Sequence, residues 1–305
     1  MSMRAVVFAY HDVGVRCLEV LLEHGVDVAL VVTHEDSAQE IIWFDSVAAL
    51  CAERGIVCIA PPDPASPELL ERLKILQPDL LLSFYYRHML PISVLEVARL
   101  GAFNMHGSLL PKYRGRAPVN WAVLHGETVT GATLHEMVAK PDAGSIVAQT
   151  SVPILPDDTA QDVFGKVVVA AGHTLSSVLP AMLDGRIPRR ANDLAQGSYF
   201  GGRTAADGQI DWTQPAQVVY NLVRAVAPPY PGAWTMIGGQ RLVVAAARLL
   251  PGDYSGFAAG LAAIAGKILG ICGDGNAINI HALYSGEMPM TASALQALLD
   301  TPPAP

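Results

Sequence analysis

Short apolar runs alternate with amphipathic, helix-like segments through the first part of the chain. The apolar runs predict strands, and the segments between them predict helices. The predicted strands are residues 4–10, 26–33, 57–60 and 80–84, and the predicted helices are residues 14–23, 46–54 and 67–76. Because parallel neighbours need such crossover helices, this order predicts an α/β fold with a doubly wound, mostly parallel sheet.

The same alternation continues to about residue 190. Further strands are expected at 102–105, 130–137 and 146–154, and further helices at 118–124 and 160–183. We therefore expect one catalytic domain over residues 1–190.

The composition changes near residue 192. The following residues are rich in Gly, Asn, Asp and Ala, which is typical of a linker, and we place that linker at residues 191–208. A second domain is expected over residues 209–305, where short strands and turn glycines predict a small β-barrel. Its expected elements are strands at 209–212, 234–237, 241–246, 266–271 and 277–282 and a helix near 216–224.

The composition indicates a folded protein with a large core. The chain has 305 residues, 51% of them hydrophobic, and a formal net charge of -8. This acidic balance argues against a nucleic-acid partner, whose binding would rest on neutralised phosphates. Apolar stretches shorter than the roughly 18 residues that cross a bilayer predict a soluble protein without membrane insertion. The four cysteines lack metal-binding spacing, so we expect buried thiols in a reducing, cytoplasmic compartment.

Polar side chains follow the predicted strand at 102–105. Asn104 and His106 are two residues apart, so in an extended strand they share one face while Met105 turns into the core. An amide donor and an imidazole suit acyl transfer, in which an oxyanion develops and a nucleophile loses a proton. Asp142 lies on a loop at another strand end. If that loop folds over the sheet edge, its carboxylate can fix the tautomer of His106.

These residues also have ordinary structural interpretations. A strand-end Asn or His often binds backbone, and Asp142 fits turn chemistry. Tyr85 and Tyr86, after the strand at 80–84, either pack the strand end or wall a flat ring or a sugar. The cations within residues 112–116 form a solvated face or bind a carboxylate or phosphate.

Several common motifs are absent from the sequence. Residues 9–14 lack the glycine triplet of a dinucleotide site, and we find neither a phosphate-binding P-loop nor a G-x-S-x-G nucleophile elbow. A nicotinamide enzyme and covalent serine catalysis are therefore disfavoured.

The run F-N-M-H-G-S-L-L-P-K-Y-R-G-R-A-P at residues 103–118 resembles the folate-dependent formyltransferases. The signature N-x-H-G-S-L-L-P with a later Asp is specific to that family, and the Tyr-Tyr-Arg and R-A-P-x-N-W blocks resemble its sugar-modifying branch. The resemblance spans nearly the whole chain. Its other blocks are residues 8–12, 83–88, 119–121, 126–128, 142–149, 156–158, 203–204, 221–226 and 230–233.

The resemblance implies a formyltransferase fold with an OB-like carboxyl-terminal barrel, and 10-formyltetrahydrofolate as co-substrate without a metal. The implied acceptor is a nucleotide-linked amino sugar. In the branch that the chain most resembles, this sugar is UDP-4-amino-4-deoxy-L-arabinose, which serves lipid A modification and polymyxin resistance. The decarboxylase domain that accompanies this branch has no counterpart in these 305 residues.

The resemblance also implies roles for individual residues. The catalytic trio falls on Asn104, His106 and Asp142, with Asn104 and His106 donating to the oxyanion and Asp142 helping to remove the proton of the attacking amine. The implied folate contacts are His88, Met89, Leu90, Arg116, Val138, Ala139, Lys140, Pro141 and Asp142. The implied sugar or nucleotide contacts are Tyr85, Tyr86, Arg203, Arg224 and Tyr230.

Three rival interpretations stay open at this point. Methionyl-tRNA formyltransferases share the trio, although their acceptor calls for a basic surface. A metal-dependent hydrolase would use His88, His106, His135 and Asp142, but no H-E-x-x-H pattern supports it. A third interpretation makes the sheet a scaffold and the barrel a non-enzymatic partner-binding module.

Overall fold

The computed structural model describes residues 3–37 and 41–301, and the fold divides into two compact units. The first unit comprises Met1–Pro118, Val129–Pro153 and Phe164–Gly201, and the second comprises Val119–Thr128, Ile154–Val163 and Gly202–Pro305. Residues 191–201 of the expected linker thus belong to the first unit. The domain limits drawn from the sequence at residues 190 and 209 stay a prediction.

The first unit is built on a seven-stranded sheet within the described residues, in the order β3-β2-β1-β4-β5-β7-β8. Its strands are β1 (Arg4–Ala9), β2 (Asp27–Val32), β3 (Cys58–Ile59), β4 (Leu80–Phe84), β5 (Gly101–His106), β7 (Val129–Glu136) and β8 (Ile146–Pro153). The first five pair in parallel, and β7 and β8 are antiparallel additions at one edge. The predicted doubly wound, mostly parallel sheet is confirmed.

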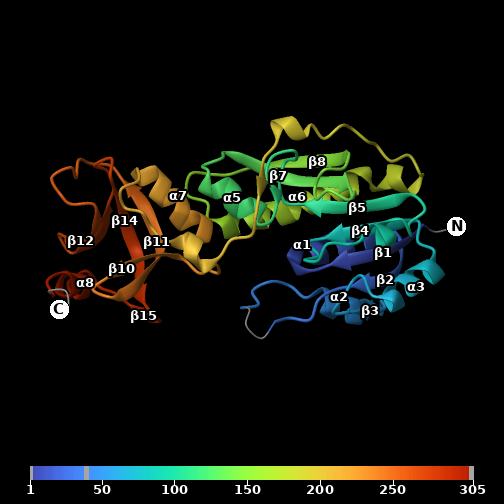
Figure 1. Cartoon of the computed structure of the whole chain (residues 1–305), viewed down its shortest axis with the longest axis horizontal. Coiled ribbons are helices and arrows are strands. Elements are labelled where there is room, and N and C mark those ends of the chain that lie inside the picture. Colours follow the sequence, from blue (N-terminus) through green and yellow to red (C-terminus); the bar gives the residue numbers. More distant parts are fainter. Residues whose placement is uncertain (1–2, 38–40, 302–305) are drawn as a thin grey trace. The chain divides into compact units, whose positions relative to one another are not determined.

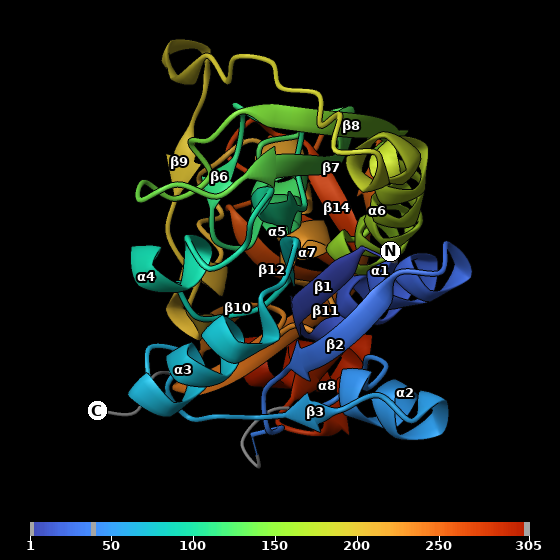
Figure 2. The ribbon, with the colours of Figure 1, turned by 90° about the vertical axis from the view of Figure 1, so that its right-hand side faces the viewer.

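Helices cover both faces of this sheet. They are α1 (His11–Glu23), α2 (Val47–Arg54), α3 (Pro67–Leu76), α4 (Ile92–Leu95) and α6 (Ala160–Leu183). The helix α5 (Pro118–Leu124) belongs, from Val119 on, to the second unit. Figure 2 shows α1 and α6 on one face and α3 and α4 on the other. Local signals fix their starts, because Ser46 and Ser66 accept the backbone N–H three residues later and Pro67 opens α3.

Burial explains why the central strands read as continuous apolar runs. Val6 and Phe8 of β1, Leu30 of β2 and Leu81 of β4 are fully buried in one cluster with Leu73 of α3. Strands covered by helices on both faces have no solvent-facing side, so their sequences lose the alternation of a half-exposed strand.

The longest helix, α6, has the length and apolar composition of a membrane span, but half of its most apolar window is buried inside the protein. A core helix can have the same length and apolar composition, so these two features do not show that α6 crosses a membrane.

The second unit is built on an antiparallel half-barrel, as expected for an OB-like domain. Its strands are β10 (Ala233–Ile237), β11 (Gln240–Leu250), β12 (Gly260–Ile264), β13 (Lys267–Ile271), β14 (Ala277–Ser285) and β15 (Met288–Pro289). The helices α7 (Ala216–Val226) and α8 (Ala292–Leu299) pack against it (Figure 1). A two-stranded parallel ribbon of β6 (Arg114–Gly115) and β9 (Tyr199–Phe200) belongs to the first unit.

Several elements differ from the expectations. The predicted strand at 209–212 is wrong, since only a single bridge joins Gln209 to Trp234. Conversely, the sequence did not predict the short elements α4, β6, β9 and β15, nor β12 and α8. β12 reads Gly-Leu-Ala-Ala-Ile, and its small residues have weak strand preference, so pairing with β13 rather than local propensity makes it a strand.

Candidate active site

The pairing register of β5 with β7 gathers polar side chains at one end of the sheet. Asn104 lies opposite His135, and His106 lies opposite Thr133. Residues that face each other across antiparallel strands share a face of the sheet. Two residues from each strand therefore project to one place, while Met105 between them is 1% exposed.

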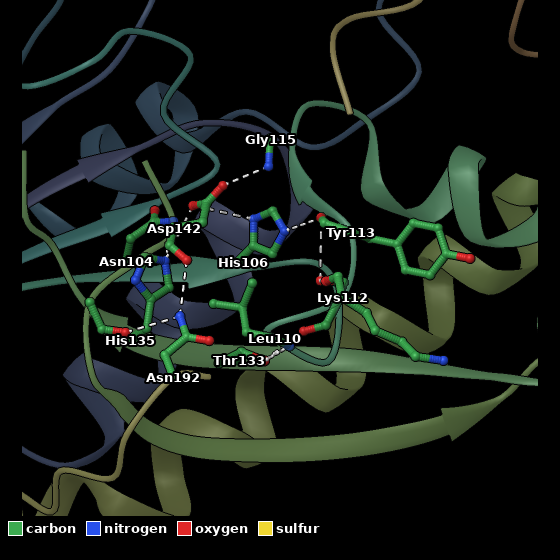
Figure 3. Close-up of polar contacts among 12 residues, drawn as sticks. Asn104, His106, Leu110, Lys112, Tyr113, Gly115, Thr133, His135, Asp142 and Asn192 are labelled. Atoms are coloured by element: carbon green, nitrogen blue, oxygen red, sulfur yellow. Dashed lines mark hydrogen bonds and ion pairs between the residues drawn. The ribbon is translucent and has the colours of Figure 1, made fainter. Parts of the chain in front are cut away.

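Asp142 completes this cluster from the loop between β7 and β8. Its Oδ1 lies 3.6 Å from Nδ1 of His106 and 3.4 Å from Nε2 of His135. Its Oδ2 accepts the backbone N–H of Gly115 at 2.8 Å. Figure 3 shows the carboxylate beside both imidazoles. The structure thus brings Asn104 and His106 of β5 together with Asp142 of the β7–β8 loop.

The hydrogen bonds of His106 fix its tautomer. Nε2 lies 2.7 Å from the carbonyl oxygen of Tyr113, and because a carbonyl only accepts, Nε2 carries a hydrogen. In the neutral ring Nδ1 is then bare and faces Asp142. A proton taken up at Nδ1 would form an ion pair with that carboxylate, so Nδ1 is the nitrogen able to accept a proton in a reaction.

Burial sets the resting charges of this pair. Burial lowers the pKa of His106, and the opposing effects of Asp142 and the Tyr113 carbonyl offset it only in part. Burial raises the pKa of Asp142, but His106, His135 and the N–H of Gly115 together hold the pKa of this carboxyl well below its usual range. The Gly115 N–H donates whatever the charge of His106, so the resting pair is a neutral imidazole beside a carboxylate.

His135 is a site residue that sequence reasoning placed only in a metal site. Its Nδ1 donates to the carbonyl of Glu136 at 2.9 Å, so Nε2 is left to accept from Nδ2 of Asn104 at 3.2 Å. The ring is 2% exposed and joins the amide of Asn104 to the neighbourhood of Asp142. The sequence does contain a signal for this residue, because Thr133 and His135 are two residues apart in a strand, like Asn104 and His106. The strand register then places the two pairs opposite each other.

Thr133 anchors the loop that follows β5. Its hydroxyl donates to the carbonyl of Ser108 at 2.6 Å and accepts from the backbone of Leu110 at 3.1 Å and the amide of Gln149 at 2.9 Å. Ser108 in turn donates to the carbonyl of Lys112 at 2.6 Å. These bonds hold the loop whose Tyr113 carbonyl meets His106.

A cavity of about 410 Å³ lies at the start of β5 and the end of β7. It is lined by α4, the turn into β5 and the end of β7, and its lining combines apolar residues such as Ile92, Leu95 and Met137 with the charged residues Glu96, Arg99 and Glu136. Asn104 lies two residues beyond Ala102 on β5, and Asp142 lies three residues beyond Ala139 on the β7–β8 loop. A larger cavity of about 540 Å³, lined by Tyr10 and His34 among others, lies at the ends of β1 to β3.

Two of the implied folate contacts line the smaller cavity, and the others lie elsewhere on the chain. Val138 and Ala139 line it, and His88, Met89 and Leu90 lie on the chain that leads into α4. Lys140 and Pro141 continue from the cavity to Asp142, whereas Arg116 is exposed beyond β6. Leu90 is 8% exposed and Met89 is 63% exposed.

The two tyrosines after β4 have different surroundings. Tyr86 is buried and stacks on His34, with ring centroids 4.1 Å apart. Tyr85 has a positive φ of 58°, and its hydroxyl occupies the space where a side chain at Gly107 would lie. Only glycine fits there, and Tyr85 therefore packs beside the residue that follows His106.

The remaining implied contacts belong to the second unit. Arg203 lies over the Trp121 ring at 4.6 Å, and burial raises the pKa of Tyr230 to about 12. Arg224 is 5% exposed and donates to the carbonyl of Asp158 at 2.8 Å and to Asn221 at 2.7 Å. Arg224 thus has a structural use in the fold.

The hypothetical metal site is not assembled. Over residues 3–37 and 41–301, no group of three or more His, Cys, Asp or Glu side chains is arranged to hold a metal ion. The metal-site interpretation expected His88 beside Asp142. His88 instead lies beside His34, with 4.8 Å between the ring centroids.

Comparisons with known proteins agree with this geometry. The model of the formyl transferase family matches residues 4–179, more than half of the chain, and that of the formyl transferase C-terminal domain matches residues 203–297.

Solved structures share the fold. One is the N-formyltransferase of Helicobacter canadensis in complex with folinic acid and dTDP-3-aminofucose, with a TM-score of 0.73, 19% identity, and coverage of 92% of this chain and 99% of that one. Another is the sugar 3N-formyl transferase WlaRD with dTDP and 5-N-formyl-THF, with a TM-score of 0.72, 17% identity, and coverage of 92% and 97%. HypX of Aquifex aeolicus with tetrahydrofolic acid has a TM-score of 0.65 and 17% identity, and the match covers 97% of this chain and 47% of HypX.

Proposed function

Because the chain belongs to the formyl transferase family, we propose that it transfers the formyl group of 10-formyltetrahydrofolate to the amine of a nucleotide-linked amino sugar. The observation that carries this proposal is the junction of Asn104, His106 and Asp142, with His135 between the amide and the carboxylate. The cavity of about 410 Å³ that Val138 and Ala139 line falls within the size range of small-molecule sites, which begins at roughly 300 Å³.

The nature of the acceptor rests on two kinds of support. One structural relative is named a sugar 3N-formyl transferase and was solved with dTDP, and another is named an N-formyltransferase and was solved with dTDP-3-aminofucose. The sequence blocks around Tyr85 and Trp121 resemble the branch that formylates UDP-4-amino-4-deoxy-L-arabinose. We therefore propose a nucleotide-linked amino sugar as the substrate class, and UDP-4-amino-4-deoxy-L-arabinose as its first candidate.

The proposed reaction starts with attack of the neutral amine nitrogen on the formyl carbon. A C–N bond forms and the carbonyl electrons move to oxygen, where the amide N–H of Asn104 donates to the oxyanion. The attacking nitrogen then loses one proton, the bond to N10 of the folate breaks, and N10 gains one proton. The products are a formamide and tetrahydrofolate.

The His106–Asp142 pair manages the charge in this sequence. Asp142 stays ionised, so it stabilises the cationic nitrogen and helps to remove its proton. Nδ1 of His106 faces Asp142 and takes up a proton transiently. Donation from His106 to the oxyanion requires Nε2 to leave the Tyr113 carbonyl, so we assign the oxyanion first to Asn104.

The four cysteines are free thiols. This is consistent with the reducing, cytoplasmic compartment that the proposal assumes.

The test is incubation of the full chain with 10-formyltetrahydrofolate and a panel of UDP- and dTDP-amino sugars, with methionyl-tRNA as a further acceptor. Mass spectrometry should show a formyl gain on a sugar nucleotide. Asn104→Ala should lower kcat by about 10²–10³, as for loss of an oxyanion donor elsewhere. Asp142→Asn should be similarly impaired, whereas Asp253→Asn, an exposed aspartate of the second unit, should retain activity. Formylation of methionyl-tRNA alone would overturn the proposal.

A further inference from the structure

Residues 189–200, expected mostly as a linker, run across both loops that surround His106. We call this segment the strap. Its backbone at Arg190 pairs with Ile146 at the start of β8, with both N···O distances 2.9 Å. Its end at Tyr199–Phe200 forms β9 beside β6. The whole strap lies within the first unit.

Asn192 holds the loop that carries Asp142. Its side-chain amide donates to the carbonyl of Asp142 at 3.0 Å and to the carbonyl of Gly144 at 3.1 Å. Figure 3 shows this amide directed at the Asp142 loop. Asp142 has a positive φ of 50°, a conformation that L residues adopt only when their surroundings hold it. The two hydrogen bonds that the Asn192 side chain donates restrain the backbone at Asp142 in this conformation.

The orientation of the Asn192 amide carries a cost. Its Oδ1 is buried and has no hydrogen-bond partner among the described residues. A buried acceptor without a partner is unfavourable, so the two donor bonds must outweigh that loss. A residue that merely filled space in a linker would not need this orientation.

Ser198 holds the other loop. Its hydroxyl accepts the backbone N–H of Tyr113 at 2.8 Å, and its carbonyl accepts the N–H of Arg114 at 3.0 Å. The ring of Phe200 stacks on Tyr113 with centroids 5.4 Å apart. The Tyr113 carbonyl that meets Nε2 of His106 is therefore held from the strap.

We propose that Asn192 and Ser198 are positioning residues, which keep the Asp142 carboxylate at Nδ1 of His106 and the Tyr113 carbonyl at Nε2. They act through these two groups and touch neither substrate nor formyl group. The catalytic purpose of this arrangement rests on the proposed formyl transfer, but the arrangement itself can be tested without it.

The sign of the effect on His106 follows from its neighbours. The titratable groups that face it are Asp142 and His135, and the Tyr113 carbonyl accepts from it. Asp142 and the Tyr113 carbonyl both favour the protonated ring, whereas burial and His135 oppose it. Releasing either loop from the strap should therefore lower the pKa of His106 further.

The first measurement is an NMR titration of the His106 ring nitrogens in the full-length protein. Asn192→Ala and Asn192→Leu should both lower the apparent pKa of His106, since leucine keeps the size of the side chain but loses the donors without adding a charge. Ser198→Ala should do the same, and Ser198→Thr should restore the wild-type value. Gln196→Ala is the control, because the Gln196 side chain donates a hydrogen bond to Asp193, which is itself part of the strap.

The second measurement is the pH dependence of formyl transfer. Asn192→Ala should lower kcat by about 10- to 100-fold, the scale of a small misplacement of catalytic groups, with KM within about twofold. The acidic limb of its pH profile should move to lower pH. Simple loss of folded protein would lower the rate without moving this limb.

The outcomes separate the two proposals. If the wild type formylates no acceptor but the strap variants shift the His106 titration, the proposed function fails and the strap stands. If the wild type is active and the titration and pH profile of Asn192→Leu and Ser198→Ala match those of Gln196→Ala, or if the pKa of His106 rises in these variants, the strap proposal is overturned.

Discussion

Gly115 occupies a position where both the backbone and its surroundings exclude a side chain. Its φ is +98°, and a Cβ built on it would lie 2.1 Å from the carbonyl oxygen of Phe200. Real Cβ contacts are essentially never below 3.0 Å, so Gly115→Ala must separate the two backbones by about 0.9 Å. That movement disrupts the bond from the Arg116 N–H to Phe200, now 3.0 Å.

The expected loss of stability follows from these two effects. A positive φ costs an L residue about 1–2 kcal/mol, and a lost hydrogen bond costs about 0.5–1.5 kcal/mol. Gly115→Ala should therefore destabilise the protein by about 1.5–3.5 kcal/mol. Gly25→Ala is the matched control, since Gly25 has φ +71° but nothing within 4 Å of its Cβ position. It should show the backbone cost alone.

The same substitution should reach the active site. The N–H of Gly115 donates to Oδ2 of Asp142 at 2.8 Å, and displacing it removes one of the contacts that keep the Asp142 pKa low. Urea unfolding monitored by circular dichroism gives the stability, and formyl transfer gives the activity. If Gly115→Ala unfolds like Gly25→Ala and keeps wild-type turnover, the account of this contact is wrong.

Three further outcomes are expected. His135→Leu should lower kcat of formyl transfer at least about tenfold, because the Asn104 amide loses its acceptor, while calorimetry should show unchanged binding of folinic acid. Thr133→Val should cost about 1–3 kcal/mol in urea unfolding, since Ser108, Leu110 and Gln149 lose a buried partner; an unchanged midpoint would contradict the anchoring role. Burial, with His88 and Arg87, lowers the pKa of His34 to about 4. Between about pH 6.5 and pH 4 the unfolded chain therefore binds a proton at His34 that the folded chain does not bind, so the folded state loses stability as the pH falls through this range. His34→Gln should therefore show a smaller fall in Tm between pH 7.5 and pH 5 than the wild type, and an equal fall in both proteins would count against this assignment.

Local patterns in the sequence accounted for the framework of the first unit. The runs that include Phe8 and Leu81 are apolar because both faces of their strands are covered, and the helices between them carry caps such as Ser66 and Pro67. The i, i+2 relation of Asn104 and His106 was also readable, since the strand period of two is a property of the backbone itself.

Contacts between distant segments were outside the reach of such patterns. β12 is a strand because β13 pairs with it, and its sequence of small residues carries little signal. The β7 register that puts His135 opposite Asn104 depends on a pairing across 31 residues. Residues 191–201 have a linker's composition, yet Asn192 and Ser198 use that polar composition to bind two loops.

The sequence by itself determined the seven strands of the first unit's sheet, the sharing of one sheet face by Asn104 and His106, and the family signature around them. Only the tertiary structure decided that Asp142 reaches Nδ1 of His106, that the Tyr113 carbonyl takes Nε2, and that His135 joins the cluster. The physical reason is that backbone periodicity is local, whereas a hydrogen bond between loops depends on where the whole chain brings them.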